Sequence, residues 1–441
     1  MRVPLSRIVT TPTLPDSADV VVIGAGIVGV FTAWFLAKRG VKVALIEKGM
    51  VGGEQSSRNW GWCRQQNRDA RELPIAIESL RLWEQFEAES GVTTGFRRSG
   101  LLYLSNDDSE LAGWGKWCNF ARSAGVKTEM LGGKAATERG GSTGKNWKGG
   151  VFAPTDGTAD PGAAAPAVAR SIMKLGGTVH QNCAARGIET EGGRVSAVVT
   201  EHGTIRTKIA VLSGGAWAST FCRQLGIRFP QATIRSSLMA VSLPRGTLPD
   251  AMHTKAITIT RRGDETYSLA ISGRGKLDLT LQKLRYANDF LAMFTRRWRS
   301  LSPGYLEGVR SGHENMGRWA LDRPTPMERI RVLDPCVDQA TIKEIHRRAI
   351  ELCPAIGAAP VAASWAGYID MTPDGVPAIG EVNEVPGFVL AAGLSGHGFG
   401  IGPGCGHLVA DLVMGLKPIV DPEPYRPERF DESVWGKVAE F

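Results

Sequence analysis

The segment Asp19-Val20-Val21-Val22-Ile23-Gly24-Ala25-Gly26-Ile27-Val28-Gly29 decides the fold of this chain. Its first half is a continuous β-branched run, as expected of a strand that is buried on both faces of a sheet. Its second half has the spacing G-x-G-x-x-G and leads into the apolar residues 30–39, which predict a helix that Gly40 ends. A second strand is expected over residues 41–46, with Glu47 at its end. This order predicts a dinucleotide-binding βαβ unit.

Each glycine of this unit has a physical role. Gly24 permits a tight turn, Gly26 lets a pyrophosphate approach the backbone, and Gly29 allows the helix and strand to pack closely. The N-terminus of the helix, at Ile27 and Val28, offers free N–H groups to phosphates. Glu47 stands where a carboxylate accepts hydrogen bonds from ribose hydroxyls, and it would repel the 2′-phosphate of NADP. The unit alone does not distinguish NAD from FAD.

The composition is that of an ordinary globular protein. The chain has 441 residues, 43% of them hydrophobic and 22% charged, so we expect two domains or one nucleotide domain with a large insertion. The net charge is +8, but the basic residues are dispersed, so no nucleic-acid interface is predicted. The seven cysteines form no C-x-x-C pair, which favours reduced thiols in the cytoplasm and argues against a metal site.

One uncharged segment has the length of a membrane span. Residues 20–37 carry no charge, but three glycines interrupt them at the positions that the nucleotide motif requires. We therefore expect a βαβ unit here and no transmembrane segment.

The rest of the chain alternates between two kinds of pattern. Strands are expected over 194–200 and 204–212, the second ending in glycines. A buried strand over 388–393, a glycine-rich turn over 394–404 and a helix over 405–414 form a second strand–turn–helix unit. Residues 226–345 differ, because they combine strands and charged turns with a basic amphipathic helix over 281–300.

Four motifs together resemble the D-amino-acid oxidase (DAO) superfamily of FAD-dependent amine oxidoreductases. The group includes glycine oxidase, D-amino-acid dehydrogenase and bacterial L-amino-acid deaminase, and the wording of the second and third motifs is closest to the deaminase. The resemblance covers most of the chain. The motifs are 21–29 with Glu47; Gly53-Glu54-Gln55-Ser56-Ser57-Arg58; 182–187 with 211–217; and 365–380 with 393–404.

The resemblance implies an α/β fold with two parts. One is a glutathione-reductase-like FAD-binding domain, a parallel sheet with a β-meander, which is discontinuous over 18–105, 150–225 and 355–425. The other is an inserted α+β substrate or cap domain, built on an antiparallel sheet, over 106–149 and 226–354.

The same resemblance assigns residues to FAD. Sarcosine oxidase-like members attach FAD covalently through a cysteine, and this chain has Gly367 at that position, so we expect non-covalent FAD. The residues expected to bind it are Gly24, Gly26, Ile27, Val28, Gly29, Glu47, Lys48, Ser56, Ser57, Arg58, Gly61, Trp62, Cys183, Gly214, Trp217, Gly367, Gly396, His397, Gly398, Phe399, Gly400 and Ile401.

The implied reaction is hydride transfer from the amine-bearing carbon of an amino acid to flavin N5, with hydrolysis of the imine to a 2-oxo acid and ammonia. A substrate carboxylate is best held by arginine, whose planar fork binds it bidentately. Arg261 is the leading candidate, and Arg262 remains open because the alignment there needs a gap. Arg64, His397 and Trp365 are further candidates at the active site.

Two other functions stay open. The substrate could be an N-substituted amino acid or an opine, or the chain could be a non-catalytic or electron-relay flavoprotein subunit. The expected electron acceptor is O2 or a quinone. A peripheral membrane contact through residues 281–300 and a homodimer also stay open.

Overall fold

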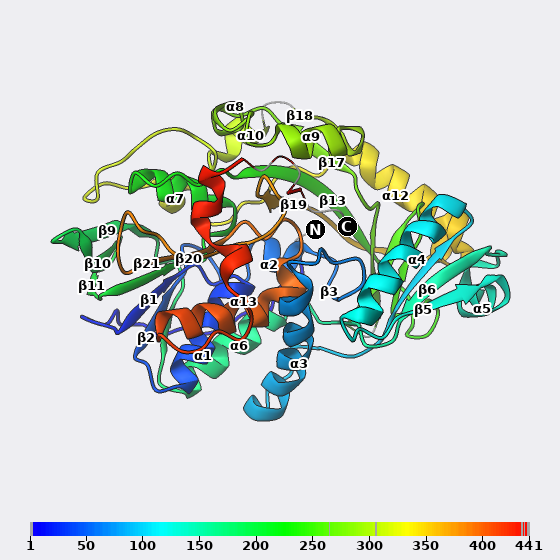
Figure 1. The fold of residues 1–441 in the computed structure, drawn as a ribbon, viewed down its shortest axis with the longest axis horizontal. Coiled ribbons are helices and arrows are strands. Elements are labelled where there is room, and N and C mark those ends of the chain that lie inside the picture. Colours follow the sequence, from blue (N-terminus) through cyan, green and yellow to red (C-terminus); the bar gives the residue numbers. More distant parts are fainter. Residues whose placement is uncertain (1–2, 264, 305–306, 434, 436, 439–441) are drawn as a thin grey trace.

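The computed structural model describes residues 3–263, 265–304, 307–433, 435 and 437–438. Two sheets organise the chain, and the first has the strand order β20-β21-β12-β1-β2-β8 (Figure 1). Its inner strands run parallel, while β20 runs antiparallel to β21 at one edge. Its strands are β1 (Val20–Ile23), β2 (Val43–Ile46), β8 (Thr178–His180), β12 (Ile209–Leu212), β20 (Ala378–Glu381) and β21 (Phe388–Ala392).

Successive side chains of these strands point to opposite faces of the sheet, and both faces are buried. Val20, Val22 and Leu45 pack against the helices α1 (Ile27–Lys38), α6 (Ala164–Lys174) and α13 (Gly398–Val413), and α3 (Leu73–Ser90) packs on α13. Val21 and Ile46 pack on the other face against a meander of three strands. These strands are β9 (Ala185–Glu191), β10 (Arg194–Thr200) and β11 (Gly203–Arg206).

The second sheet is larger and mostly antiparallel. Its order is β18-β17-β13-β16-β15-β14-β4-β6-β5, with β19 paired to β13. Two neighbours, β14 with β4 and β17 with β18, run parallel, so the sheet is mixed where the sequence predicts an antiparallel one. Its strands are β4 (Leu101–Ser105), β5 (Glu129–Gly132), β6 (Gly149–Ala153), β13 (Ala232–Ser242), β14 (Ala251–His253), β15 (Thr258–Arg262), β16 (Thr266–Ala270), β17 (Gly275–Asp278), β18 (Leu301–Gly304) and β19 (Val361–Met371).

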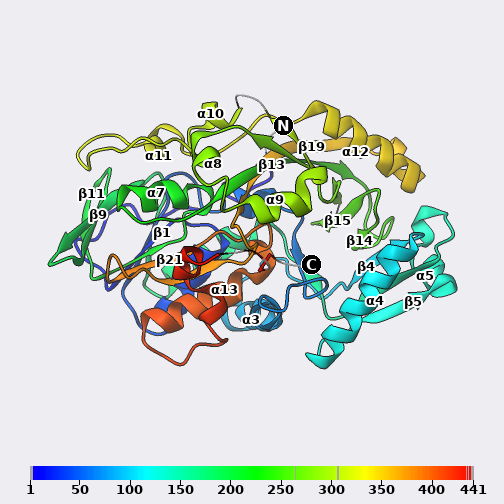
Figure 2. The same cartoon turned by 45° about the horizontal axis from the view of Figure 1, so that its top comes forward.

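Helices and short elements complete the two halves. Helix α12 packs on β13 and β16, and Figure 2 shows α4 and α5 in a lobe with β4 and β5 that lies away from α13. The remaining elements are α2 (Gln55–Arg58), β3 (Trp62–Cys63), α4 (Asp108–Ser123), α5 (Gly133–Arg139), β7 (Gly157–Thr158), α7 (Ala218–Gln224), α8 (Leu281–Arg285), α9 (Leu291–Arg297), α10 (Glu307–Ser311), α11 (Pro326–Arg329) and α12 (Gln339–Leu352), with 3-10 turns at Gly141–Thr143, Gly215–Trp217, Trp298–Ser300, Pro354–Ala358, Glu423–Tyr425 and Pro427–Asp431.

Two predicted elements are divided in the structure. The single strand expected over 204–212 is two strands in different sheets, because the chain turns at Thr207, whose hydroxyl bonds to the carbonyl of Asp19 beside β1. The long helix expected over 281–300 is α8 and α9. It is interrupted after Tyr286, which is buried, and Asp289 forms an ion pair with Arg228 instead of continuing a helix.

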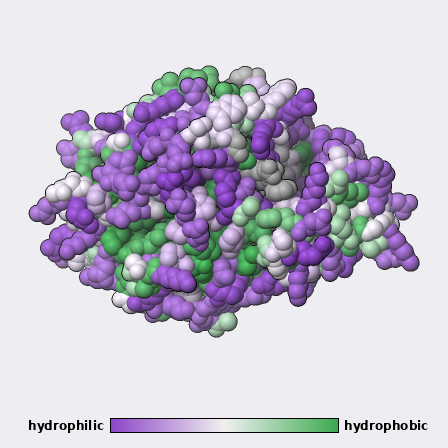
Figure 3. All heavy atoms as spheres, viewed as in Figure 1, coloured by the Kyte–Doolittle hydropathy of each residue, from purple (hydrophilic) through white to green (hydrophobic). Residues whose placement is uncertain are grey.

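The segment 281–300 nevertheless keeps an amphipathic surface. Leu281, Leu284 and Trp298 are exposed, and arginines stand between them. Figure 3 shows hydrophobic surface at the top of the molecule, over α8, within a largely hydrophilic face. In the described part of the chain, no helix is long and apolar enough to cross a membrane, and residues 20–37 divide into β1 and α1.

The glycine-rich turn expected over 394–404 is shorter than predicted. Helix α13 begins at Gly398, so most of those glycines are helical. They leave room for neighbouring helices: a Cβ at Gly404 would lie 2.5 Å from Ser79 Oγ of α3, and one at Gly406 would lie 2.6 Å from the backbone nitrogen of Thr32 in α1. The glycines therefore serve close helix packing as well as the turn.

Candidate cofactor and active site

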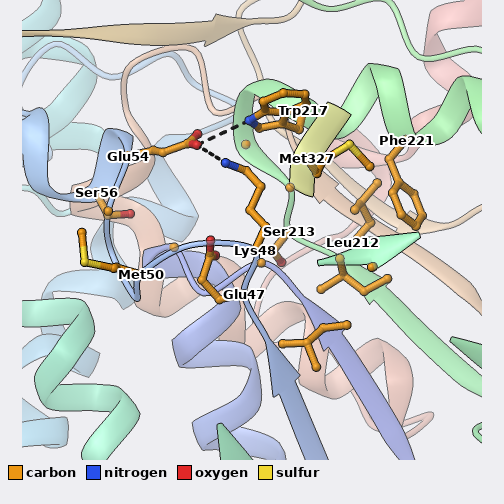
Figure 4. Close-up of a pocket in the computed structure, with 18 of the residues that line it drawn as sticks. Glu47, Lys48, Met50, Glu54, Ser56, Leu212, Ser213, Trp217, Phe221 and Met327 are labelled. Carbon is orange, nitrogen blue, oxygen red and sulfur yellow. Dashed lines mark hydrogen bonds and ion pairs between the residues drawn. The ribbon is translucent and has the colours of Figure 1, made fainter. Parts of the chain in front are cut away.

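A pocket opens at the carboxyl edge of the first sheet, where ligands of open α/β sheets bind (Figure 4). Eight of the residues predicted to bind the cofactor line it: Gly24, Gly26, Glu47, Lys48, Ser56, Cys183, Gly214 and Trp217. The sequence did not single out the others as site residues: Ile23, Ile46, Met50, Gly52, Gly53, Glu54, Gln55, Ala185, Leu212, Ser213, Gly215, Phe221 and Met327.

The glycine turn has the geometry that the motif predicts. Gly24 has φ +99°, and a Cβ there would lie 2.4 Å from the carbonyl oxygen of Ser213. A Cβ at Gly29 would lie 1.9 Å from the carbonyl oxygen of Gly24, so helix and turn touch directly. Gly26, the N-cap residue of α1, makes no side-chain capping bond, and Ser56 Oγ of α2 accepts a hydrogen bond from Ile27 N–H at 2.8 Å. The backbone therefore forms a cradle of the kind that holds a pyrophosphate.

Glu47 is fixed by two backbone amides at the end of β2. Its Oε2 accepts from Ala25 N–H and its Oε1 accepts from Gly49 N–H, both at 2.8 Å. Burial raises the pKa of this carboxyl, while Lys48 and the two amides act in the opposite direction. Each oxygen can still accept a further bond, so the carboxylate suits the ribose hydroxyls of a dinucleotide.

Lys48, Glu54 and Trp217 form a connected group across the pocket (Figure 4). Lys48 Nζ forms an ion pair with Glu54 and lies 4.9 Å from the centroid of the Trp217 ring. Trp217 Nε1 donates to Glu54 Oε1 at 3.4 Å. Burial would raise the pKa of Glu54, but Lys48 outweighs it and holds the pKa below its usual value. Glu54 belongs to the motif at residues 53–58, and this motif is the feature of the sequence that could have indicated Glu54 as a site residue.

A distant segment closes one side of this pocket. Met327 lines it, Leu333 N–H donates to Glu54 Oε1 at 3.0 Å, and the carbonyl oxygens of Ile330 and Arg331 accept from Lys48 Nζ. Glu328 forms an ion pair with Arg186 at 2.9 Å. No sequence motif marks these residues, because their role depends on contacts between positions far apart in the chain.

The first turn of α13 lies at the same sheet edge as the first turn of α1, since β21 runs parallel to β12, and β12 runs parallel to β1. A Cβ at Gly400 would lie 2.7 Å from the carbonyl oxygen of Trp62, so the loop after α2 runs directly against α13. His397 Nδ1 lies 2.8 Å from Glu72 Oε2. The predicted residues Gly396 to Ile401 thus gather beside Gly61 and Trp62, away from the pocket of Figure 4.

The strand β15 brings the second sheet to this loop. Trp62 Nε1 donates to Thr260 Oγ1 at 2.7 Å, and Arg262 Nη2 donates to the carbonyl oxygen of Ser57 at 2.9 Å. The guanidinium of Arg262 lies 5.2 Å from the centroid of the Trp365 ring. Its Nη1 is buried and has no hydrogen-bond partner among the residues that the structure describes.

Arg261 lies on the opposite face of the same strand. It forms a bidentate ion pair with Asp250, at 2.6 and 2.9 Å, and its cross-strand partner Tyr267 belongs to a different hydrophobic cluster from Trp365. Arg64 Nη1 donates to Tyr103 OH at 3.2 Å, and the Arg64 guanidinium lies 5.7 Å from the centroid of the Trp62 ring.

Trp365, a candidate for the active site, and Gly367, a predicted FAD residue, both contact Arg58. Trp365 Nε1 donates to the carbonyl oxygen of Arg58 at 3.1 Å, and a Cβ at Gly367 would lie 3.2 Å from Arg58 Cβ. Arg58 Nη1 donates to the carbonyl oxygen of Ala366 at 2.7 Å. Ile27, Val28 and Gly29 form the first turn of α1, beside the pocket.

The glycine cradle, the acid after β2 and two helix N-termini at one sheet edge define a dinucleotide-binding oxidoreductase fold. Residues 19–412 match the family model described as "DAO: FAD dependent oxidoreductase". The chain belongs to this family of FAD-dependent oxidoreductases, and the cradle and acid described above fit FAD as its cofactor.

Three comparisons illustrate the range of relatives. Glycine oxidase of Pseudomonas putida is 26% identical over 430 residues, which cover 93% of this chain and 99% of the relative. Mitochondrial sarcosine dehydrogenase of Mus musculus is 25% identical and covers 96% of this chain, which spans only 42% of that relative's length. The solved structure of L-amino acid deaminase from Proteus vulgaris is 28% identical with a TM-score of 0.91, covering 96% of this chain and 100% of that one.

Proposed function

We propose that this protein oxidises the amine-bearing carbon of an amino acid. The observation that carries this proposal is Arg262, a buried arginine that lies over Trp365 and beside Ser57 of α2, and whose Nη1 has no partner among the described residues. A buried cation with a free donor suits the carboxylate of a small substrate. The similarity to glycine oxidase and L-amino acid deaminase supports the same substrate class.

In this proposal, bound FAD supplies the site that accepts the hydride. The protein orients the substrate: Arg262 binds its carboxylate, and Trp365 and Trp62 form apolar walls that exclude water. This assignment replaces Arg261, the leading candidate from the sequence, with its neighbour, because Arg261 faces Asp250 on the far side of the sheet. Arg64, whose guanidinium lies 5.7 Å from the centroid of the Trp62 ring, is a further candidate to contact the substrate.

We assign FAD binding to the first sheet and substrate binding to the second. The first sheet and its meander correspond to a glutathione-reductase-like FAD-binding domain over 18–105, 150–225 and 355–425, and the second sheet to a substrate domain over 106–149 and 226–354. Strands β4, β6 and β19 come from the first set of ranges but pair within the second sheet, so the two domains share strands. Gly367 offers no nucleophile, which supports non-covalent FAD.

The compartment and the electron acceptor are part of the same proposal. All seven cysteines are free and six of them are buried, which supports a reducing compartment, the cytoplasm. O2 and a quinone are the two acceptors to be compared.

A second candidate is the oxidation of an N-substituted amino acid. The similarity to sarcosine dehydrogenase favours it. The products discriminate the two, because a primary amine yields ammonia, whereas an N-methyl substrate yields formaldehyde or a released amine.

The test is anaerobic mixing of the FAD-loaded protein with both enantiomers of the amino acids, and with N-methyl amino acids, while the flavin absorbance is followed. Bleaching by one class identifies the substrate, and products are then measured with O2 and with a quinone. FAD that no amine reduces would overturn the proposal and favour an electron-relay subunit.

A further inference from the structure

A buried carboxylate beside α3 holds the histidine at the start of α13. Glu72 immediately precedes α3 and is fully buried, and its Oε2 accepts a hydrogen bond from His397 Nδ1 at 2.8 Å. His397 is the N-cap residue of α13, yet its side chain makes no capping hydrogen bond to this helix. The Nδ1 atom of the ring therefore bonds to Glu72 and to no amide of its own helix.

The charges around this pair define its protonation. Burial and the positive charge of Arg68 lower the pKa of His397, so the imidazole is neutral near pH 7. Burial would raise the pKa of Glu72, but His397 and Arg68 outweigh it and hold the pKa below its usual value. A neutral imidazole that donates to a carboxylate must carry its proton on Nδ1.

Two further polar atoms are buried here without a partner. Neither Glu72 Oε1 nor Arg68 Nη1 has a hydrogen-bond partner within the described part of the chain. Buried polar atoms are normally satisfied, by protein, water or ligand. Glu72, Arg68 and His397 therefore form one group of buried polar side chains beside the start of α13.

We propose that Glu72 is a positioning residue that keeps the His397 ring off the N-terminus of α13, so that the amides of Gly398 and its neighbours stay free for FAD. These amides and the helix dipole favour negative charge, which increases on FAD when it is reduced. The inference rests on FAD binding alone and does not depend on which amine is oxidised.

The same helix contains a matched pair for comparison. His407 Nδ1 lies 2.9 Å from Asp411 Oδ2, and the side chains are exposed to the same degree: 21% for each histidine, with 3% for Asp411 and 0% for Glu72. This pair lies toward the other end of α13, and Asp411 also forms an ion pair with Arg39 at 2.7 Å, so it controls for the loss of a buried carboxylate of α13 that bonds to a histidine.

The test is the midpoint potential of bound FAD, measured by equilibration with a reference dye. Glu72→Leu frees the ring to cap α13, so the equilibrium between reduced and oxidised FAD should shift about tenfold toward the oxidised form, about 30 mV for two electrons. Glu72→Gln keeps an oxygen that accepts from Nδ1 and should lie closer to the wild type. Asp411→Leu should leave the potential unchanged.

Two measurements make the result decisive. In a His397→Ala background, Glu72→Leu should cause no further shift, since it acts through the ring. A shift that persists there, or one equal for Glu72→Gln and Glu72→Leu, would overturn the proposal. If Glu72→Leu does not retain FAD, 15N NMR of histidine-labelled holoenzyme decides: His397 protonated on Nδ1 supports the proposal, and protonation on Nε2 alone overturns it.

Discussion

Arg261 and Arg262 are consecutive residues of β15, and their guanidinium groups lie on opposite faces of the second sheet. Arg262 lies over Trp365 and donates to the carbonyl oxygen of Ser57, whereas Arg261 forms a bidentate ion pair with Asp250. Because successive side chains of a strand point to opposite faces, only one of the two can reach α2.

This alternation predicts different effects for the two arginines. Arg262→Leu should raise the KM for an amino acid about a hundredfold, because charge-assisted hydrogen bonds to a carboxylate contribute about 3 kcal/mol. Steady-state kinetics and anaerobic flavin reduction measure this. An amine without a carboxylate should be affected much less.

Arg261→Leu is the matched control. It leaves Asp250 without its bidentate partner, so we expect lower stability in urea unfolding but a KM within a few-fold of the wild type. A larger effect on KM from Arg261→Leu than from Arg262→Leu would restore the original assignment.

The sequence predicts a feature well when the residues that determine it lie close together in the chain. The first βαβ unit was predicted correctly, since Gly24, Gly29 and Glu47 act on neighbouring backbone. The choice between Arg261 and Arg262 needs the register of β15 against β16, which no local pattern contains. The start of α13 was placed too late, because glycines that serve helix packing resemble those of a turn.

Substitutions of Lys48 and Glu54 should have strongly non-additive effects on the free energy of unfolding. Both side chains are largely buried, with exposures of 12% and 18%, so Lys48→Met leaves a carboxylate without its partner. We expect a loss of about 3 kcal/mol in the free energy of unfolding. The double variant with Glu54→Gln should lose less than the sum of the single changes.

Urea unfolding with and without FAD measures this coupling. The exposed pair Lys148–Asp108, with exposures of 56% and 81%, is the control and should show a coupling energy below about 1 kcal/mol. Equal coupling in the two pairs would contradict the role given to burial.

Asp370 should make stability depend on pH. Burial raises the pKa of this carboxyl to about 6 from 3.8, although the amides of Leu394 and Gly393 act against it. The folded protein therefore holds this proton at a higher pH than the unfolded chain does. Its contribution is fully present below pH 3.8 and is lost as the pH rises through about 6.

Asp370→Asn removes this dependence. Relative to the wild type, the variant should gain stability between about pH 4 and pH 7, by up to about 3 kcal/mol, since one pKa unit corresponds to about 1.4 kcal/mol. Urea unfolding of the FAD-loaded proteins across this range measures the difference. Asp108→Asn, at an exposed position, should show a constant difference, and a constant difference for Asp370→Asn would refute the prediction.

The contact between α1 and α13 should tolerate no side chain at Gly406. A Cβ there would meet the backbone nitrogen of Thr32 at 2.6 Å and Phe31 Cβ at 2.7 Å, and neither atom can move without shifting α1, whose first turn forms the cofactor cradle. Gly406→Ala should therefore lower the free energy of unfolding by about 3 kcal/mol and weaken FAD binding.

Gly113→Ala in α4 is the matched control, because a Cβ there has nothing within 4 Å. It should stabilise the protein by about 0.5–1 kcal/mol, since alanine favours a helix over glycine. Thermal unfolding and FAD titration of the two variants check both signs, and a stabilised, FAD-replete Gly406→Ala would show that the two helices are not packed as closely as the structure indicates.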